Sequence, residues 1–171
     1  MNKLNSMNND NLYQDIINDI MSNKKFKKLN ECVHHGTTRL EHSMRVSYYS
    51  YKITKKMKLN YIETARGGLL HDFFLNDDLT YKKQKLSMFF HPYPALENAK
   101  KYFKTTPLEE DIIINHMFPT LPHKIPKSLE SWIVSMVDKA VAIYEFYESY
   151  GKTVVYKLPN LYIILLLLLH W

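Results

Sequence analysis

Glycine and cysteine are scarce in this chain of 171 residues, and each scarcity excludes a class of protein. The 4 glycines and 7 prolines are too few for an all-β chain, which needs a turn about every 8–12 residues. The single cysteine, Cys32, can form neither an internal disulfide nor a site of several thiolates. We therefore expect a mostly helical fold in a reducing, cytoplasmic setting.

Long apolar segments are also missing. The first residues, MNKLNSMNNDNLYQD, contain no apolar stretch of the kind that a secretory signal requires. The longest apolar run, residues 161–169, is much shorter than the roughly 20 residues that span a bilayer. We expect no membrane span. The apolar tail over residues 151–171 is instead expected to pack on the core or on a second subunit of a homo-oligomer.

Basic residues outnumber acidic ones, giving a net charge of +6. Lysines cluster at residues 24–28 and 82–85, but neither cluster alternates with aromatic residues, and the chain has no zinc finger or glycine-rich nucleotide loop. Solvated helix faces explain such lysines better than nucleic-acid binding does. A basic surface also suits a small phosphorylated substrate, which it attracts electrostatically.

Helical periodicity dominates the rest of the sequence. With 46% hydrophobic residues, the chain can bury a core, and its length fits a single domain over residues 1–171. Apolar spacing and caps predict helices at 11–22, 38–60, 62–72, 94–103, 107–116 and 127–150. In the last helix, the expected buried side carries Trp132, Ile133, Met136, Val137, Ala140 and Tyr144. We predict an all-α bundle of about six to eight helices, with a core at 38–147 and an N-terminal helical extension at 1–30.

Residues of metal-ligand type occur where a solvated surface would not require them. They are His42, His71, Asp72, His91, His116 and Asp138. The segments GLLHDFFL and IVSMVDKAVAIY place two of these carboxylates among residues that favour burial, and a buried carboxylate needs a cation or several donors. A divalent metal would meet that need. Nitrogen and oxygen ligands without thiolate point to Fe, Mn, Co, Ni or Zn.

An ordinary structural role stays open for each of these residues. Buried polar side chains are usually hydrogen-bonded to neighbouring protein groups rather than to a metal. Asp138, for example, has Arg45 and Lys139 as possible partners. The set as a whole, spread over separate helices, favours the metal interpretation.

Three segments together resemble the HD-domain metal-dependent phosphohydrolases. RLEHSMRVSYYSYKI is similar to the helix that bears the family's first histidine, GGLLHDFFL to its His-Asp doublet, and MVDKAVAIYE to the helix that bears its last aspartate. The resemblance implies a metal held by His42, His71, Asp72 and Asp138. Leu75 stands where one large branch has the lysine of HDIGK, which argues against a cyclic-di-GMP phosphodiesterase.

The middle of the chain resembles the subgroup with two further histidines. FFHPYPALENAKKYF and IIINHMFP are similar to the segments that carry them. This resemblance implies a second metal bound by His91 and His116, with Asp72 bridging the pair.

The resemblance implies hydrolysis of a phosphate ester or anhydride by water that one or two metals activate, and we expect the substrate to be a nucleotide. Asp72 would orient that water. Arg39 lies three residues before His42, on much the same helix face, and is the first candidate for a phosphate-binding cation. Lys139 is the second candidate, and both cations could equally have structural roles. Two alternatives stay open: a non-catalytic metal- or nucleotide-binding regulatory module of the same fold, and a basic nucleic-acid-binding domain.

Overall fold

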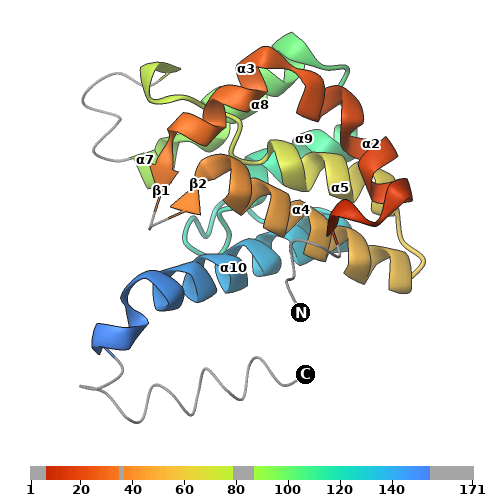
Figure 1. Cartoon of the computed structure of the whole chain (residues 1–171). Coiled ribbons are helices and arrows are strands. Elements are labelled where there is room, and N and C mark those ends of the chain that lie inside the picture. Colours follow the sequence, from red (N-terminus) through yellow and green to blue (C-terminus); the bar gives the residue numbers. More distant parts are fainter. Residues whose placement is uncertain (1–6, 35–36, 79–86, 155–171) are drawn as a thin grey trace.

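A computed structural model describes residues 7–34, 37–78 and 87–154 (Figure 1). Its elements are α2 (Asn11–Ser22), α3 (Lys24–Lys27), the 3-10 turn η1 (Lys28–Glu31), β1 (Val33–His34), β2 (Thr37–Thr38), α4 (Arg39–Lys56), α5 (Tyr61–Leu70), the 3-10 turn η2 (Asn76–Asp78), α7 (Ser87–Phe90), α8 (Pro92–Tyr102), α9 (Pro107–Asn115) and α10 (Leu129–Val154). The predicted all-α bundle is confirmed. The two short strands pair antiparallel just before α4.

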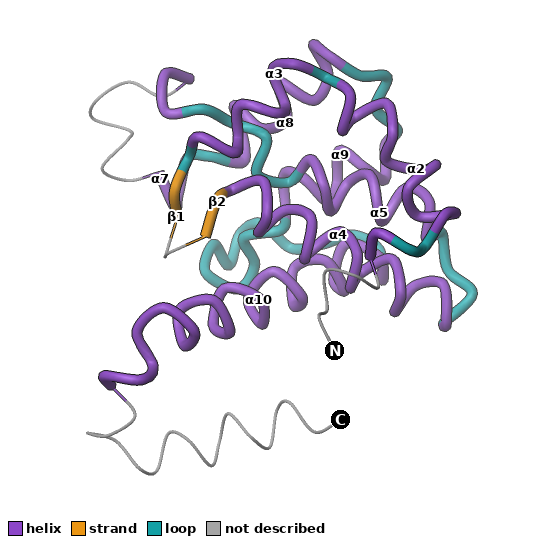
Figure 2. Tube along the Cα trace, in the orientation of Figure 1, coloured by secondary structure: helices purple, strands orange, loops and turns teal. Residues whose placement is uncertain are grey.

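The helices α4 and α5 form the centre of the bundle (Figure 2). They approach closely because Gly68 has no side chain: a Cβ there would lie 3.1 Å from the Cα of Ser47. The Ser47 hydroxyl donates to the carbonyl of Ala65 across the same contact, at 2.6 Å. The helix α9 packs on α5, and α10 packs across α4 and α9.

The N-terminal extension belongs to the main core. The predicted helix at residues 11–22 coincides with α2, which buries Tyr13, Ile17 and Ile20 completely. The Tyr13 hydroxyl donates to Ser47 Oγ at 2.9 Å, so α2 is tied to α4. Within the described residues, no helix has the length and apolar character needed to cross a membrane.

Caps set the helix boundaries that the sequence predicts best. The Thr38 side chain caps α4 by accepting from the backbone N–H of Glu41. The Glu41 side chain accepts from the backbone N–H of Thr38, which completes a capping box. Thr106 and Glu109 do the same for α9, whose first residue is Pro107. By contrast, α3 and α7 each have four residues and too little periodicity to predict. The lysines at 82–85 and the apolar run at 161–169 lie outside the described residues.

The buried side of α10 differs from the prediction. Trp132 and Met136 were expected to be buried, but they are 37% and 56% exposed, and Ala140 is exposed as well. The inward side carries Ser131, Val134, Ser135, Val137, Asp138, Val141 and Glu145. Val137 is buried as predicted, and Ile133 packs partly buried against the same core cluster. Because polar and small residues occupy much of the inward side, the pattern of large apolar residues was wrong at Trp132, Met136 and Ala140.

Candidate metal centre

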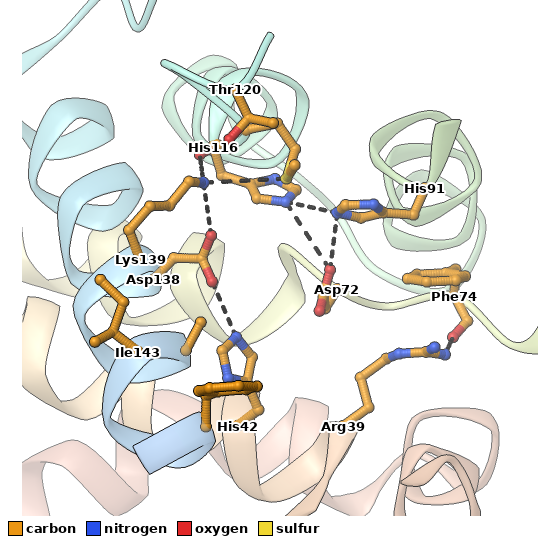
Figure 3. Close-up of a pocket in the computed structure, with 13 residues that line it drawn as sticks. Arg39, His42, Asp72, Phe74, His91, His116, Thr120, Asp138, Lys139 and Ile143 are labelled. Carbon is orange, nitrogen blue, oxygen red and sulfur yellow. Dashed lines mark hydrogen bonds and ion pairs between the residues drawn. The ribbon is translucent and has the colours of Figure 1, made fainter. Parts of the chain in front are cut away.

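The structure brings the six predicted ligand-type residues together at one end of the central helices. Figure 3 shows all of them except His71. His42 lies in the second turn of α4, and Asp138 lies near the middle of α10. The other four stand at helix ends: His71 and Asp72 directly after α5, His91 directly before α8, and His116 directly after α9. All are buried except Asp72, whose side chain is 14% exposed.

One group of ligand atoms joins α4, α5 and α10. His42 Nε2 lies 3.0 Å from Asp138 Oδ1, and His71 Nε2 lies 3.6 Å from the same oxygen. One ligand atom from each of these three residues falls within 4.8 Å of the others. Three donors at such separations can converge on one cation.

A second group adjoins the first through Asp72. One ligand atom from each of His71, Asp72 and His116 falls within 4.8 Å of the others. Asp72 Oδ1 lies 3.1 Å from His91 Nε2 and 3.9 Å from His116 Nε2, while Oδ2 lies 3.8 Å from His71 Nε2. The two Nε2 atoms of His91 and His116 are 2.8 Å apart. The two oxygens of Asp72 therefore face different histidines.

Hydrogen bonds at the outer ring nitrogens fix the orientation of two histidines. His71 Nδ1 lies 2.8 Å from the carbonyl of Gly68, and His116 Nδ1 lies 2.7 Å from the carbonyl of Ile113. A carbonyl only accepts, so each Nδ1 must carry the proton. The neutral ring then has its lone pair on Nε2, which points into the cluster, as a metal ligand requires.

Two buried atoms of the cluster lack a hydrogen-bond partner among the described residues. They are His71 Nε2 and Asp72 Oδ1. The Asp72 oxygen lies 3.1 Å from His91 Nε2, a contact that is an ion pair only when His91 is protonated. Leaving a buried polar group unpaired costs about 1–3 kcal/mol. A divalent cation would satisfy both atoms, so the donor set fits a metal.

Electrostatics keep the carboxylates of the cluster ionised. Burial raises the pKa of Asp72, but His71, His91 and His116 outweigh it and hold this pKa well below its usual range. Burial also raises the pKa of Asp138, but the hydrogen bond from His42 and the nearby charges of His71 and Lys139 more than offset it, so this pKa is likewise low. The pKa of His42 rises to about 10, because bonds to Asp138 and Glu145 outweigh burial.

A pocket of about 530 Å³ opens onto the cluster, a size usual for small-molecule sites. Its lining comprises Arg39, His42, Asp72, Phe74, His91, His116, Met117, Thr120, Asp138, Lys139, Ala142, Ile143 and Phe146. Charged and imidazole groups gather on one part, and apolar side chains of Phe74, Met117 and the C-terminal half of α10 form the remainder. The pocket can thus accept a ligand with a charged and an apolar end.

Both predicted cations line this pocket. The Arg39 guanidinium lies 3.8 Å from the centre of the Phe74 ring and donates to the Phe74 carbonyl at 2.6 Å. Lys139 Nζ lies 2.8 Å from Asp138 Oδ2 and donates to the carbonyl of His116 at 2.6 Å. Of the two partners considered for Asp138, Lys139 is the one that the structure shows.

Glu145 is a site residue that the sequence prediction missed. Its side chain is 3% exposed, and its Oε2 lies 2.7 Å from His42 Nδ1. Arg45 pairs with the other oxygen of Glu145 rather than with Asp138. A signal was available, because a residue seven positions after Asp138 lies two turns along the same face of a helix.

Comparison with known families matches the chain to a family model described as HD domain, over residues 39–143. This range covers more than half of the chain and includes all six ligand-type residues. No curated protein and no solved structure matches the sequence.

Proposed function

Because the chain belongs to the HD-domain family, which is one of metal-dependent phosphohydrolases, we propose that it hydrolyses a phosphate ester or anhydride of a small molecule. The observation that best supports this activity is the convergence of four histidines and two aspartates beneath a pocket. The orphaned Nε2 of His71 and Oδ1 of Asp72 add to it, since a cation would satisfy both.

Our proposal assigns the ligands to one or two divalent ions. His42, His71, Asp72 and Asp138 would hold the first ion, and His91 and His116 would hold a second, with Asp72 between the two. Nitrogen and oxygen donors fit Fe, Mn, Co, Ni or Zn. A metal bound there would lower the pKa of water toward neutrality and polarise the phosphoryl group.

The protein's own groups would then place the substrate. Arg39, held against Phe74, would donate to the phosphoryl oxygens, and Lys139 would add positive charge from the side of α10. Asp72 would accept a hydrogen bond from the attacking water and orient it toward phosphorus. These three residues are the catalytic residues that we propose.

We propose a nucleotide as the substrate. The pocket combines these cations with an apolar wall that includes Ile143 and Phe146. A nucleotide matches this division, because its phosphates are anionic and its base has apolar faces that stack on aromatic rings. We also propose a cytoplasmic location, which rests on the single free cysteine.

Self-association is the partner interaction that we propose. Large apolar side chains stand exposed along α10, namely Leu129, Trp132, Met136, Ile143 and Phe146. Ile143 and Phe146 line the pocket, whereas Leu129, Trp132 and Met136 do not. A second copy of the chain could cover these three residues and leave the pocket open. Light scattering on a sizing column tests this: we expect a dimer for the native protein and a monomer for Met136→Lys.

Metal analysis by mass spectrometry tests the proposed activity. Protein purified without chelator or metal-binding tag should contain about one to two equivalents of metal and should hydrolyse at least one member of a nucleotide panel. Asp72→Ala should lose both metal and turnover. Asp77→Ala, the same change at an exposed carboxylate five residues later, should retain both.

Three outcomes would contradict the proposal. No metal in the native protein, even after reconstitution, would mean that the six residues are hydrogen-bonded core groups. Bound metal and bound nucleotide without any turnover would identify a regulatory binding module of the same fold. Nucleic-acid affinity that falls steeply with salt would indicate the other alternative, a basic nucleic-acid-binding domain.

A further inference from the structure

A buried carboxylate on α10 has no role in the function proposed above. Glu145 lies two turns beyond Asp138 and is almost completely enclosed. Its Oε2 lies 2.7 Å from His42 Nδ1, and its Oε1 lies 2.5 Å from Arg45 Nη1. An enclosed carboxylate with both oxygens engaged is costly to desolvate, so its partners must offset that cost.

The bond to Glu145 decides which way the His42 ring faces. A carboxylate oxygen accepts, so His42 Nδ1 donates to it. The opposite nitrogen, Nε2, then lies 3.0 Å from Asp138 Oδ1, inside the candidate metal cluster. The two α10 carboxylates thus hold the imidazole between them.

The need for this carboxylate follows from the position of His42 in its helix. His71 and His116 stand just past helix ends and donate from Nδ1 to carbonyls three residues earlier. His42 lies within α4, where the carbonyls of the helix already accept backbone N–H groups. Its Nδ1 therefore takes an acceptor from a neighbouring helix.

Arg45 completes the arrangement. It lies three residues after His42 on α4 and is partly exposed, with 22% of its side chain accessible. Its Nη1 also lies 3.4 Å from Thr37 Oγ1, which anchors the guanidinium beside the start of α4. The arginine both neutralises the Glu145 carboxylate and restricts its rotation.

We propose that Glu145, supported by Arg45, is a positioning residue that holds His42 with Nε2 toward Asp138 and strengthens this nitrogen as a metal ligand. The inference rests on the metal site proposed above and adds to it the residue that orients the first histidine. Acceptors in such positions typically contribute about 10- to 100-fold to metal affinity.

Cobalt titration of the metal-free, full-length protein tests this role. Co²⁺ is followed by its visible absorption in the native protein, in Glu145→Gln and in Glu148→Gln, a matched change at an exposed glutamate on the same helix. We expect Glu145→Gln to raise the Kd for Co²⁺ about 10- to 100-fold and to alter the absorption band. Glu148→Gln should match the native protein in both.

Urea unfolding of the metal-free variants separates positioning from a merely structural role. A structural role would lower the unfolding midpoint of Glu145→Gln and leave the Kd and spectrum of the folded protein unchanged, which would overturn the inference. If Glu145→Gln does not fold, Arg45→Gln takes its place, because it removes only the support. It should weaken Co²⁺ binding in the same direction, and unchanged affinity would overturn the inference.

The same titration distinguishes this inference from the proposed function. Equal binding by all three proteins leaves the metal site in place and excludes the role of Glu145. Absence of binding in all three, the native protein included, overturns the metal site and with it any role for Glu145 in orienting a ligand.

Discussion

Arg39 is fixed more firmly than a surface arginine. Its guanidinium lies against the Phe74 ring and donates to the Phe74 carbonyl. The residue is only 8% exposed, although it lines the pocket. A planar guanidinium held in this way loses little conformational freedom when it binds phosphate. Arg39 thus has the geometry of a preorganised anion-binding group.

Replacement of Arg39 should therefore weaken substrate binding. We expect Arg39→Ala to raise KM for the phosphorylated substrate about 10- to 100-fold, since a hydrogen bond to a charged group contributes about 1.5–3 kcal/mol. Lys56→Ala, at an exposed position at the end of the same helix, serves as the control. Steady-state kinetics measure the effect, and unchanged KM and kcat in Arg39→Ala would assign the arginine a purely structural role beside Phe74.

The residue scale also shows how far the sequence could predict the site. The six ligand-type residues were predictable because their chemistry conflicts with their apolar surroundings, as for Asp138 in IVSMVDKAVAIY. The structure confirms that they converge, whereas their role as ligands stays a prediction. Glu145 was not predicted, because its importance depends on contact with His42, 103 positions away in the sequence.

At the scale of helices, the start of α4 depends on a charged cap. Glu41 accepts from the Thr37 hydroxyl at 2.6 Å and from the Thr38 backbone. The Thr37 hydrogen bond outweighs burial and, with the bond from Thr38, lowers the pKa of Glu41. Folding therefore favours the ionised form of Glu41. The stability that the ionised carboxylate contributes is fully present above the unfolded pKa of about 4.3. It is lost as the pH falls through the lower pKa of the folded state.

Acid should consequently weaken this cap. We expect the free energy of unfolding of the metal-free native protein to fall more steeply between about pH 5 and pH 3 than that of Glu41→Gln, which has no carboxylate to protonate. Urea unfolding at a series of pH values measures both slopes. Parallel curves for the two proteins would show that the ionised cap contributes nothing to stability.

Gly68 provides a second prediction at this scale. Alanine normally favours a helix over glycine by about 1 kcal/mol. At Gly68 the new Cβ would meet the Ser47 backbone at 3.1 Å, and α4 cannot yield there as a flexible side chain could. We expect Gly68→Ala to lower stability by about 1–3 kcal/mol, as thermal or urea unfolding would show. A stabilised variant would mean that α4 and α5 can separate easily.

Helix prediction from sequence succeeded where local chemistry set the boundary and failed where burial depended on the whole fold. Thr38 as a cap and Pro107 as a first residue predicted the starts of α4 and α9, and the structure adds Thr106 as the cap of α9. The buried face of α10 was wrong at Trp132 and Met136, because that helix turns Ser131, Ser135 and two carboxylates inward. A site that requires buried polar groups disturbs the apolar periodicity on which the prediction depends.

At the scale of the whole molecule, the candidate metal centre links elements that are distant in sequence. Its side chains come from α4, α10 and the ends of α5, α8 and α9. Ligands that bind only the folded state stabilise it by mass action. Metal should thus stabilise the entire bundle and not only the residues that contact it.

Thermal unfolding should report this coupling. At a metal concentration of 100 times Kd, the expected gain is about 2.7 kcal/mol, which would raise Tm by several degrees. Differential scanning calorimetry with and without chelator, followed by metal addition, measures the gain. Asp72→Ala should show no such shift, and an equal shift in that variant would place the stabilising ion elsewhere.

The positions of His71 and His116 have a consequence for genetics. Each ring uses one nitrogen to close the end of its own helix and presents the other to the cluster, so loss of either histidine is pleiotropic. Asparagine places an amide nitrogen near the position of Nδ1, and glutamine places one near Nε2. Substitution by asparagine therefore keeps the hydrogen bond to the helix carbonyl and removes the nitrogen that faces the cluster. Such a variant is a separation-of-function allele, whereas alanine would remove both roles at once.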